Sequence, residues 1–375
     1  MPAYLDHNAT TPLDPRVLDV MLPYLKGPYG NPSSLHRFGR AARDGVERAR
    51  AQVAALVGAQ PQEVIWTSGG TEANNLALKG LCTGVLQARV LYGATEHPAV
   101  MEAAEGLKIL GHAVEKIAVM VDGCIDWPAF TQQCAIGPVR VASLMRANNE
   151  TGVLQDTARS ARLVHGAGGW LHVDATQAAG KLPLSMTECA ADLLTLSSHK
   201  LYGPKGIGAL VVKAEVDLTP LLHGGAQERG LRGGTENLPA IVGFGAAAEL
   251  ALLEREEHTA HVLALHQQLE SGLSQMRAVT IFGSHAERLA NTTQFALSGW
   301  DGEALLMNLD RKGFAVSSGS ACASGSGEPS HVLLAMGVDP VMAKGAVRVS
   351  FGRGNTAEEV QQFLVALAGF AGQVA

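Results

Sequence analysis

The stretch LLTLSSHKLYGPKGIGAL, from Leu193 to Leu210, contains two apolar runs separated by a short turn. The first run ends in Ser-Ser-His-Lys, and the turn that follows reads Tyr-Gly-Pro-Lys-Gly. This pattern predicts two buried β-strands joined by a turn, with Lys200 at the end of the first strand. An amine in that position is partly desolvated, which lowers its pKa and enables it to form a Schiff base with an aldehyde. A surface lysine that begins a loop is the alternative interpretation.

A second strand-like run, WLHVDATQ from Trp170 to Gln177, contains an acid near its end. The chain between Asp174 and Lys200 is long enough for one crossover and a return to the same edge of a parallel sheet. A carboxylate beside a Schiff-base lysine is the arrangement that pyridoxal phosphate requires, because the acid keeps the ring nitrogen protonated and the amine holds the aldehyde. The two runs together therefore indicate a pyridoxal phosphate site.

The composition is that of a large α/β enzyme. Hydrophobic residues make up 47% of the 375 residues and charged residues only 17%, which suits well-buried strands in one large and one smaller domain. A net charge of −6 without long basic runs argues against nucleic-acid binding. The amino terminus does not resemble a signal peptide, and no apolar segment reaches membrane-spanning length. We therefore expect a cytoplasmic protein with no membrane role.

The five cysteines are scattered and lack CxxC spacing, which disfavours a disulfide framework and a zinc site. We expect free thiols and no bound metal. Cys322 lies in VSSGSACASGSGEPSHVL, from Val316 to Leu333, where small residues surround it on both sides. A flexible linker with an incidental thiol is one interpretation of this segment. The other is a tether that carries a sulfur atom from a buried site to the surface.

Polar residues also follow the apolar runs between residues 60 and 150. Gly70 and Thr71 lie between the strand-like VIW run and a helix from Glu72, where unpaired N–H groups and the helix dipole favour a phosphate. His97 follows the RVLYG run, and its ring could stack on a planar cofactor, although a structural role at the helix start is the alternative. Asn149 follows the VRVASLM run. Such residues meet at the same edge of an open parallel sheet.

The second half of the chain adds a polar loop and a smaller set of elements. The Pro220 to Asn237 loop is rich in glycine and arginine, and its arginines suit an anion such as a phosphate from the same or a neighbouring subunit. Residues from about Ala240 to Met276 are predicted to form a long helical connection. Beyond it, Arg348 lies in a strand-like run, where its guanidinium could grip a substrate carboxylate or form a simple salt bridge.

Taken together, these motifs resemble the cysteine desulfurases of the NifS/IscS type, within the class V aminotransferase group of fold-type I pyridoxal phosphate enzymes. Two small departures from the family pattern are Ser198, where alanine or glycine is usual, and Ala226, where glycine or histidine is common. The long cysteine segment resembles the NifS and IscS group rather than the SufS-like group. The motifs that carry the resemblance run in family order over nearly the whole chain: YLDHNATTPLD, GNPSSLHRFG, TSGGTEANN, TEHPAV, ANNETG, HVDATQAAGKLP, SSHKLYGPKGIGAL, GGAQERGLRGGTEN, SSGSACASGSGEPSHVL and VRVSFGR.

The resemblance implies a role for each residue that matches a family motif. Three would be catalytic: Lys200 as the Schiff-base lysine and base, Cys322 as the sulfur acceptor, and His97 as a ring-stacking and proton-transfer group. The other implied roles are Asp174 at the ring nitrogen, Gln177 at the ring hydroxyl, Asn149 beside the cofactor and the substrate carboxylate, Arg348 at that carboxylate, Gly70, Thr71, Ser197 and His199 at the phosphate, and Thr235 at the phosphate from the second subunit.

The resemblance also implies a fold, a reaction and partners. The expected fold is α/β, with a large domain (15–250) built on a mainly parallel seven-stranded sheet flanked by helices, and a small α+β domain (1–14 and 251–375) that carries the cysteine. The expected reaction converts L-cysteine to L-alanine and leaves a persulfide on Cys322. A homodimer with shared sites and an iron–sulfur scaffold or another sulfur-acceptor protein would be the partners. A selenocysteine lyase or a class V aminotransferase on the same scaffold is the alternative.

Overall fold

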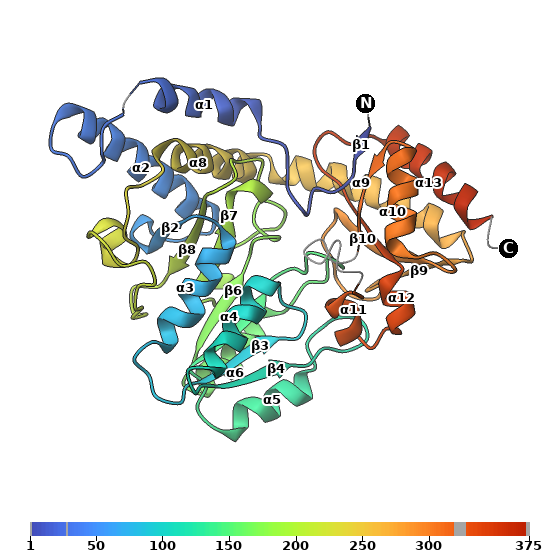
Figure 1. The fold of residues 1–375 in the computed structure, drawn as a ribbon, viewed down its shortest axis with the longest axis horizontal. Helices are drawn as coiled ribbons and strands as arrows, with labels where there is room; N and C mark the ends of the chain where they lie inside the picture. The colour runs from blue at the N-terminus through green and yellow to red at the C-terminus, as the bar shows by residue number, and fades with distance from the viewer. Residues whose placement is uncertain (1, 28, 319–327, 373–375) are drawn as a thin grey trace.

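The computed structural model describes residues 2–27, 29–318 and 328–372, so Cys322 lies outside the described residues. Figure 1 shows a large sheet surrounded by helices and a smaller sheet beside helices α9, α10 and α13. The helices of the second group are α9 (Arg255–Ser274), α10 (Gly302–Arg311), α11 (His331–Ala335), α12 (Pro340–Lys344) and α13 (Ala357–Ala371).

The large sheet has seven strands in the order β2–β8–β7–β6–β5–β3–β4. The run from β7 to β4 is parallel throughout, and β8 is antiparallel to both of its neighbours. This arrangement confirms the predicted mainly parallel, seven-stranded sheet. Its strands are β2 (Val64–Thr67), β3 (Arg89–Gly93), β4 (Ala113–Ile117), β5 (Val141–Met145), β6 (Trp170–Asp174), β7 (Leu193–Ser197) and β8 (Gly208–Val212).

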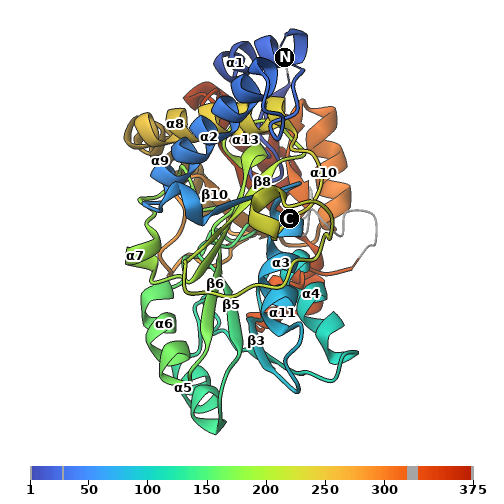
Figure 2. The same cartoon turned by 90° about the vertical axis from the view of Figure 1, so that its left-hand side faces the viewer.

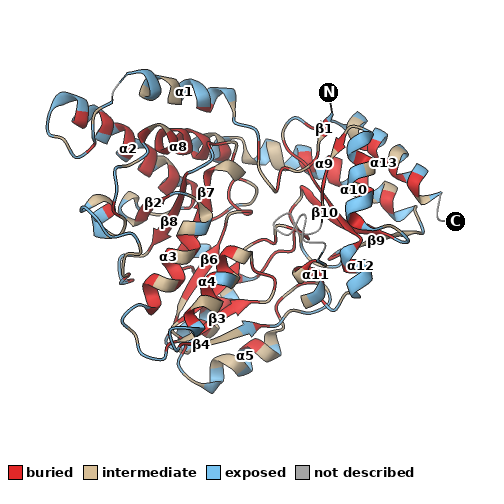
Figure 3. Cartoon of the chain, in the orientation of Figure 1, coloured by how far each residue is buried: buried red, intermediate tan, exposed pale blue. Residues whose placement is uncertain are grey.

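Helices cover both faces of this sheet. Alternate residues of a strand point to opposite sides, and here both sides are apolar. Leu194 and Leu196 of β7 belong to the core formed with α2, α5, α6, α7 and α8, whereas Leu193 belongs to the core formed with α3 and α4. Figure 2 shows α3 and α4 on one side of the strands, and Figure 3 shows that the strands themselves are mostly buried. The helices are α1 (Pro15–Lys26), α2 (Arg37–Leu56), α3 (Gly70–Cys82), α4 (Pro98–Lys108), α5 (Trp127–Ile136), α6 (Thr157–Gly166), α7 (Met186–Cys189) and α8 (Leu238–Leu253).

The smaller sheet is antiparallel, in the order β12–β13–β10–β9, and has its own hydrophobic core. The amino-terminal strand β1 (Ala3–Tyr4) pairs with β11 (Phe314–Ala315), and Ala3 and Leu5 join this second core. The first residues of the chain therefore pack with its last third. The other strands are β9 (Val279–Ile281), β10 (Thr292–Leu297), β12 (Ser317–Ser318) and β13 (Ala346–Ser350).

The predicted helical connection from about Ala240 to Met276 consists of two helices, α8 and α9, which meet at Glu254. The backbone of Glu254 leaves the helical region, with φ at −101° and ψ at 3°. Its carboxylate forms ion pairs with Arg16, at 2.5 Å, and with Arg353, at 3.1 Å. These partners come from opposite ends of the chain, so a local sequence pattern does not reveal the break.

The glycine- and arginine-rich loop is attached to the edge strand β2 by a buried ion pair. Arg50 and Glu228 form two parallel hydrogen bonds of 2.8 Å each. Glu228 also accepts from the backbone N–H of Trp66, at 2.9 Å, and Arg50 donates to the carbonyl of Val64, at 2.8 Å. Both backbone groups belong to β2, whose outer side has no strand partner among the described residues. The ion pair therefore satisfies backbone groups on a sheet edge that pairs with no strand among the described residues.

The Glu228→Gln variant is expected to lower the free energy of unfolding by about 3 kcal/mol, because it removes the buried carboxylate that pairs with the buried guanidinium of Arg50. Urea unfolding of the variant and the wild-type protein measures this difference. Glu47→Gln is the matched control, since Glu47 pairs with the same guanidinium at 3.2 Å but its side chain is 57% exposed. Its effect should stay below about 1 kcal/mol. Equal effects of the two substitutions would contradict the importance of the buried pair.

Candidate active site

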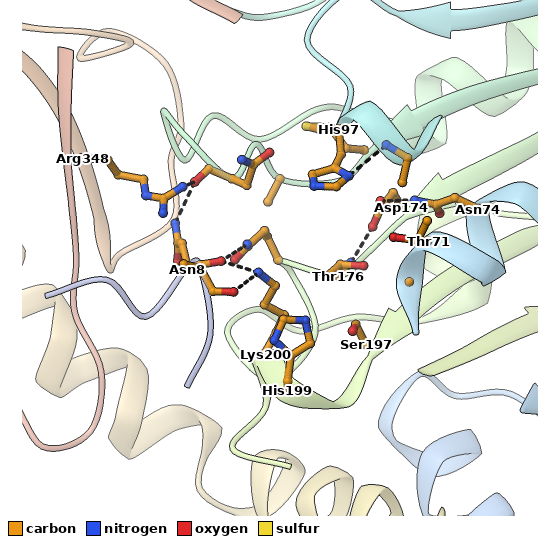
Figure 4. Close-up of a pocket in the computed structure, with 17 residues that line it drawn as sticks. Asn8, Thr71, Asn74, His97, Asp174, Thr176, Ser197, His199, Lys200 and Arg348 are labelled. Carbon is orange, nitrogen blue, oxygen red and sulfur yellow. Dashed lines mark hydrogen bonds between the residues drawn. The ribbon is translucent and has the colours of Figure 1, made fainter. Parts of the chain in front are cut away.

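The carboxyl ends of the parallel strands open onto a cavity of about 330 Å³ (Figure 4). Side chains that follow β3, β5, β6 and β7 line it, together with the start of α3, the amino-terminal segment and one residue of β13. Of the residues predicted from the sequence, the cavity brings together Gly70, Thr71, His97, Asn149, Asp174, Gln177, Ser197, His199, Lys200 and Arg348. The residues that the sequence reasoning did not single out are Asn8, Ala9, Asn74, Ala99, Met145, Ala147 and Thr176.

Lys200 lies immediately after β7, at the end of a short 3₁₀ turn (Ser198–Lys200). Its amine donates hydrogen bonds to the backbone carbonyls of Asn8, at 2.5 Å, and Ala9, at 2.6 Å. These contacts aim the flexible lysine side chain into the cavity, as Figure 4 shows. The structure therefore confirms the predicted position of Lys200 at a strand end.

Asp174 is the last residue of β6, the strand next to β7 and parallel to it. The side chain of Asn74 donates to one carboxylate oxygen, at 2.8 Å, and the backbone N–H of Thr176 donates to the other, at 2.9 Å. The residue is only 6% exposed. These two hydrogen bonds fix the orientation of the carboxylate beside the cavity.

A buried histidine supports the strand that carries Asp174. The ring of His172 lies between the hydroxyls of Ser143 on β5, at 2.7 Å, and Thr195 on β7, at 2.9 Å. Burial lowers the pKa of His172 to about 4, so the ring is neutral at pH 7. This chain of hydrogen bonds joins three neighbouring strands, and His172 lies two residues before Asp174 on the middle one.

The start of α3 forms a cradle with the loops after β6 and β7. A Cβ atom added to Gly70 would lie 3.3 Å from the hydroxyl of Thr176 and 3.6 Å from Cβ of Ser197, so glycine leaves this space open. The Thr176 hydroxyl is buried without a hydrogen-bond partner among the described residues. Free N–H groups at a helix start and an available hydroxyl suit a phosphate. His199 lies nearby, with Nδ1 at 3.1 Å from the Thr10 hydroxyl, and burial lowers its pKa to about 4.

His97 both caps a helix and lines the cavity. Its Nδ1 accepts from the backbone N–H of Ala99, at 3.1 Å, and so caps the start of α4, while its ring also lines the cavity. Burial is the main cause that lowers its pKa; the nearby Lys200 and His331 act in the same direction, and Asp174 acts against them. A neutral ring that accepts at Nδ1 carries its proton on Nε2.

Arg348 lies in β13 and is only 1% exposed. Its guanidinium donates to the carboxylate of Asp6, at 2.6 Å, and to the backbone carbonyl of Asn149, at 2.9 Å. Its Nε has no hydrogen-bond partner among the described residues. The salt bridge considered from the sequence is therefore present, and the same guanidinium lines the cavity.

Asn8 connects the site to the rest of the chain, and no local pattern identified it. Its backbone carbonyl accepts from Gln177, at 2.9 Å, as well as from Lys200. Its side-chain amide donates to the Thr292 hydroxyl, at 2.8 Å, and to the carbonyl of Asn149, at 3.1 Å. In the sequence, Asn8 is marked only by its place in the family motif YLDHNATTPLD. That motif does not show which residues Asn8 contacts.

Two predicted residues are not part of this cavity as described. Thr235 is exposed in the loop before α8 and does not line it, and Cys322 lies outside the described residues. Within the described ranges, no group of three His, Cys, Asp or Glu residues could hold a metal ion. Nor does any helix in these ranges combine the length and apolar character needed to cross a membrane.

A mainly parallel sheet with a lysine and a carboxylate at its strand ends defines a class of α/β enzymes. Solved structures resemble this chain over most of its length. A structure titled NifS-like protein superposes with a TM-score of 0.92 at 35% identity over the whole of both chains. A structure titled SspA in complex with cysteine gives a TM-score of 0.81 at 30% identity, covering 93% of this chain and 99% of the other.

Curated sequences point to the same group. A protein of Gluconacetobacter diazotrophicus named cysteine desulfurase is 44% identical over 98% of this chain and 92% of its own length. One from an Anaeromyxobacter species named cysteine desulfurase IscS is 45% identical over 96% of this chain and 90% of its own length. The chain belongs to the class-V aminotransferase family, whose pattern matches residues 3–363.

Proposed function

We propose that this chain is a cysteine desulfurase, which converts L-cysteine to L-alanine and retains the sulfur as a persulfide on Cys322. The observation that carries this function is the convergence of the Lys200 amine and the Asp174 carboxylate on one cavity, at the ends of neighbouring parallel strands. The desulfurase names of relatives that match nearly the full length support the same reaction.

The cavity fits pyridoxal phosphate, because it offers an amine, an oriented carboxylate and an open cradle at a helix start. When bound, this cofactor supplies an aldehyde that joins amines and a ring that accepts electrons. Lys200 would hold the aldehyde. The other proposed contacts are Asp174 at the ring nitrogen, Gln177 at the ring hydroxyl, His97 and Asn149 beside the ring, Gly70, Thr71, Ser197 and His199 at the phosphate, and Thr235 at the phosphate of the second copy in a homodimer.

The side chains around the cofactor site would bind the substrate and transfer protons. Arg348 and Asn149 bind the substrate carboxylate, and the pairing of Arg348 with Asp6 holds the guanidinium in place for that contact. The Lys200 amine would act as the base that removes the proton from the substrate Cα. His97 is neutral near pH 7 because burial lowers its pKa, and it can accept the proton of a thiol at Nδ1 when that atom gives up its hydrogen bond from Ala99.

The sulfur transfer itself requires the thiolate of Cys322. This thiolate attacks the substrate sulfur, so that an S–S bond forms while the C–S bond breaks. The electrons of the broken bond stay with the substrate, which takes up a proton and leaves as alanine. The persulfide sulfur then passes to an iron–sulfur scaffold or another sulfur-acceptor protein, and we place this activity in the cytoplasm.

The proposed division into a large domain (15–250) and a small domain (1–14 and 251–375) is supported by separate hydrophobic cores. The cores on the two faces of the large sheet draw their residues from 17–289, nearly all of them before 252. The core of the smaller sheet draws on Ala3, Leu5 and residues from Val262 onward. Arg348 and the segment around Asn8 therefore approach the cavity from the side of the small domain.

Incubation of the purified protein with L-cysteine and dithiothreitol tests the proposed reaction. We expect alanine and sulfide in equal amounts, together with the visible absorption of bound pyridoxal phosphate. A selenocysteine lyase would instead release selenide from L-selenocysteine and leave L-cysteine unchanged. An aminotransferase would need a 2-oxo acid as acceptor and would form no sulfide. Either of these results would overturn the proposed function.

A further inference from the structure

Thr176 is a residue of the active-site cavity to which the proposed function gives no role. It lies two positions after Asp174, just beyond β6, and lines the cavity. Its hydroxyl oxygen is buried and has no hydrogen-bond partner among the described residues. A buried hydroxyl without a partner costs free energy, because its hydrogen bonds to water are lost. A ligand in the cavity that accepts a hydrogen bond would offset this cost.

The backbone of Thr176 is held by the carboxylate that the proposed function assigns to the ring nitrogen. Its N–H donates to Oδ1 of Asp174, at 2.9 Å, and Asn74 donates to Oδ2 of the same carboxylate, at 2.8 Å. Figure 4 shows Thr176 next to Asp174 in the cavity. The position from which the Thr176 side chain extends is therefore fixed relative to Asp174.

The hydroxyl of Thr176 lies beside the start of α3. A Cβ atom added to Gly70, the first residue of this helix, would be 3.3 Å from the hydroxyl oxygen and 3.6 Å from Cβ of Ser197. Glycine leaves that space open. The preceding residue, Gly69, provides no side chain to cap the first N–H groups of α3. An open space, uncapped N–H groups and an unpartnered hydroxyl therefore meet on one side of the cavity.

The charges at the start of α3 are compatible with an anion. Glu72 is the acidic residue in the first turn of the helix, and its carboxylate pairs with Arg232, at 3.0 Å. The helix dipole favours a negative group at this end. A phosphate offers several oxygens that accept hydrogen bonds, from the backbone N–H groups and from a hydroxyl alike. The hydroxyl and the helix start together therefore fit a phosphate.

We propose that the Thr176 hydroxyl donates a hydrogen bond to the phosphate of the bound cofactor. Thr176 thereby links the two ends of the cofactor site, because its N–H orients Asp174 at the ring nitrogen and its hydroxyl binds the phosphate. A hydroxyl that donates to an ionised phosphate forms a charge-assisted hydrogen bond, which is stronger than one between neutral groups. This inference rests on the proposed function, since it adds a residue to the proposed phosphate site.

Binding of two related aldehydes tests the inference without measuring turnover. The full-length protein, freed of cofactor, is titrated with pyridoxal phosphate and separately with pyridoxal, which lacks the phosphate. Equilibrium dialysis gives the Kd of each. Both aldehydes can react with the Lys200 amine, so the ratio of the two Kd values isolates the contribution of the phosphate.

Thr176→Val removes the hydroxyl and keeps the branched shape and the backbone N–H that orients Asp174. We expect its affinity for pyridoxal phosphate to fall about tenfold, because a hydrogen bond to a charged group is lost. Its affinity for pyridoxal should stay within about twofold of the wild-type value, since no phosphate is present to lose a contact. Thr176→Ser keeps a hydroxyl, so its ratio of Kd values should stay within about threefold of the wild-type ratio.

Thr83→Val is the matched control. Thr83 is exposed at the opposite end of α3, where its hydroxyl donates to the carbonyl of Lys79, at 2.8 Å. The same substitution there should leave both Kd values unchanged.

An unchanged ratio in folded Thr176→Val would overturn the inference while leaving the proposed function intact. An equal loss of affinity for both aldehydes would also overturn it, because the hydroxyl would then act on the ring or on the fold, and so would a Thr176→Ser ratio as low as that of Thr176→Val. Circular dichroism checks the fold, and if the valine variant does not fold, Thr176→Ala decides by the same ratio. A wild-type protein that binds neither aldehyde would instead contradict the proposed function.

Discussion

Lys200→Ala is expected to reduce alanine formation from L-cysteine by at least about 10³-fold, because it removes both the covalent anchor of the cofactor and the base for the substrate Cα. The Lys200 amine is the group that the carbonyls of Asn8 and Ala9 aim into the cavity. The measurement is the rate of alanine release at saturating L-cysteine, together with the absorption spectrum of the purified variant.

Lys205→Ala is the matched control for this variant. Lys205 lies in the same Tyr-Gly-Pro-Lys-Gly turn but is exposed and does not line the cavity. Its rate should stay within about twofold of the wild-type rate, since an exposed side chain away from the site contributes little. A Lys200→Ala variant that retained most of the wild-type rate would show that another group supplies the amine.

Cys322→Ala is expected to abolish sulfide release from L-cysteine in the presence of dithiothreitol, while the absorption of bound cofactor remains. The reason is chemical, because only a thiolate can attack the substrate sulfur and hold it as a persulfide. Sulfide and alanine are measured together, and trapping with an alkylating agent followed by mass spectrometry detects the persulfide on the wild-type protein.

Cys124→Ala is the matched control for the thiol. Cys124 is half-buried, and burial together with the charge of Asp122 raises its pKa to about 11, so it stays protonated near pH 7. The control should keep the wild-type rate and the persulfide. Equal sulfide release by wild type and Cys322→Ala would make Cys322 a bystander and favour a lyase reaction on the same site.

The parts of the site that the sequence predicts are those that follow an apolar strand. A buried strand ends where its apolar run ends, so Asp174 and Lys200 could be placed at strand ends, and the parallel order of β6 and β7 brings them to one edge. His97 and Asn149 follow the same logic after β3 and β5. Each of these residues lies in the cavity because it is at or just after the end of a parallel strand.

The parts that the sequence does not predict depend on contacts between distant segments. Asn8 enters the site because the amino-terminal segment binds Thr292 and Ser350, and Lys181 turns inward only because Asn8 and Gln177 accept its hydrogen bonds. The spacing of apolar residues along the chain does not predict contacts between such distant residues. The family motifs did contain these residues, but they gave them no role.

The packing of the amino-terminal segment against β13 has a consequence for the order in which the site is assembled during synthesis. The amine of Lys200 is aimed by Asn8, and the backbone N–H of Asn8 is in turn held by the hydroxyl of Ser350, at 2.9 Å. A chain that leaves the ribosome amino terminus first cannot make this last contact until Ser350 has emerged. The reactive lysine is therefore ordered only when nearly the whole polypeptide exists, so unfinished chains lack a competent site.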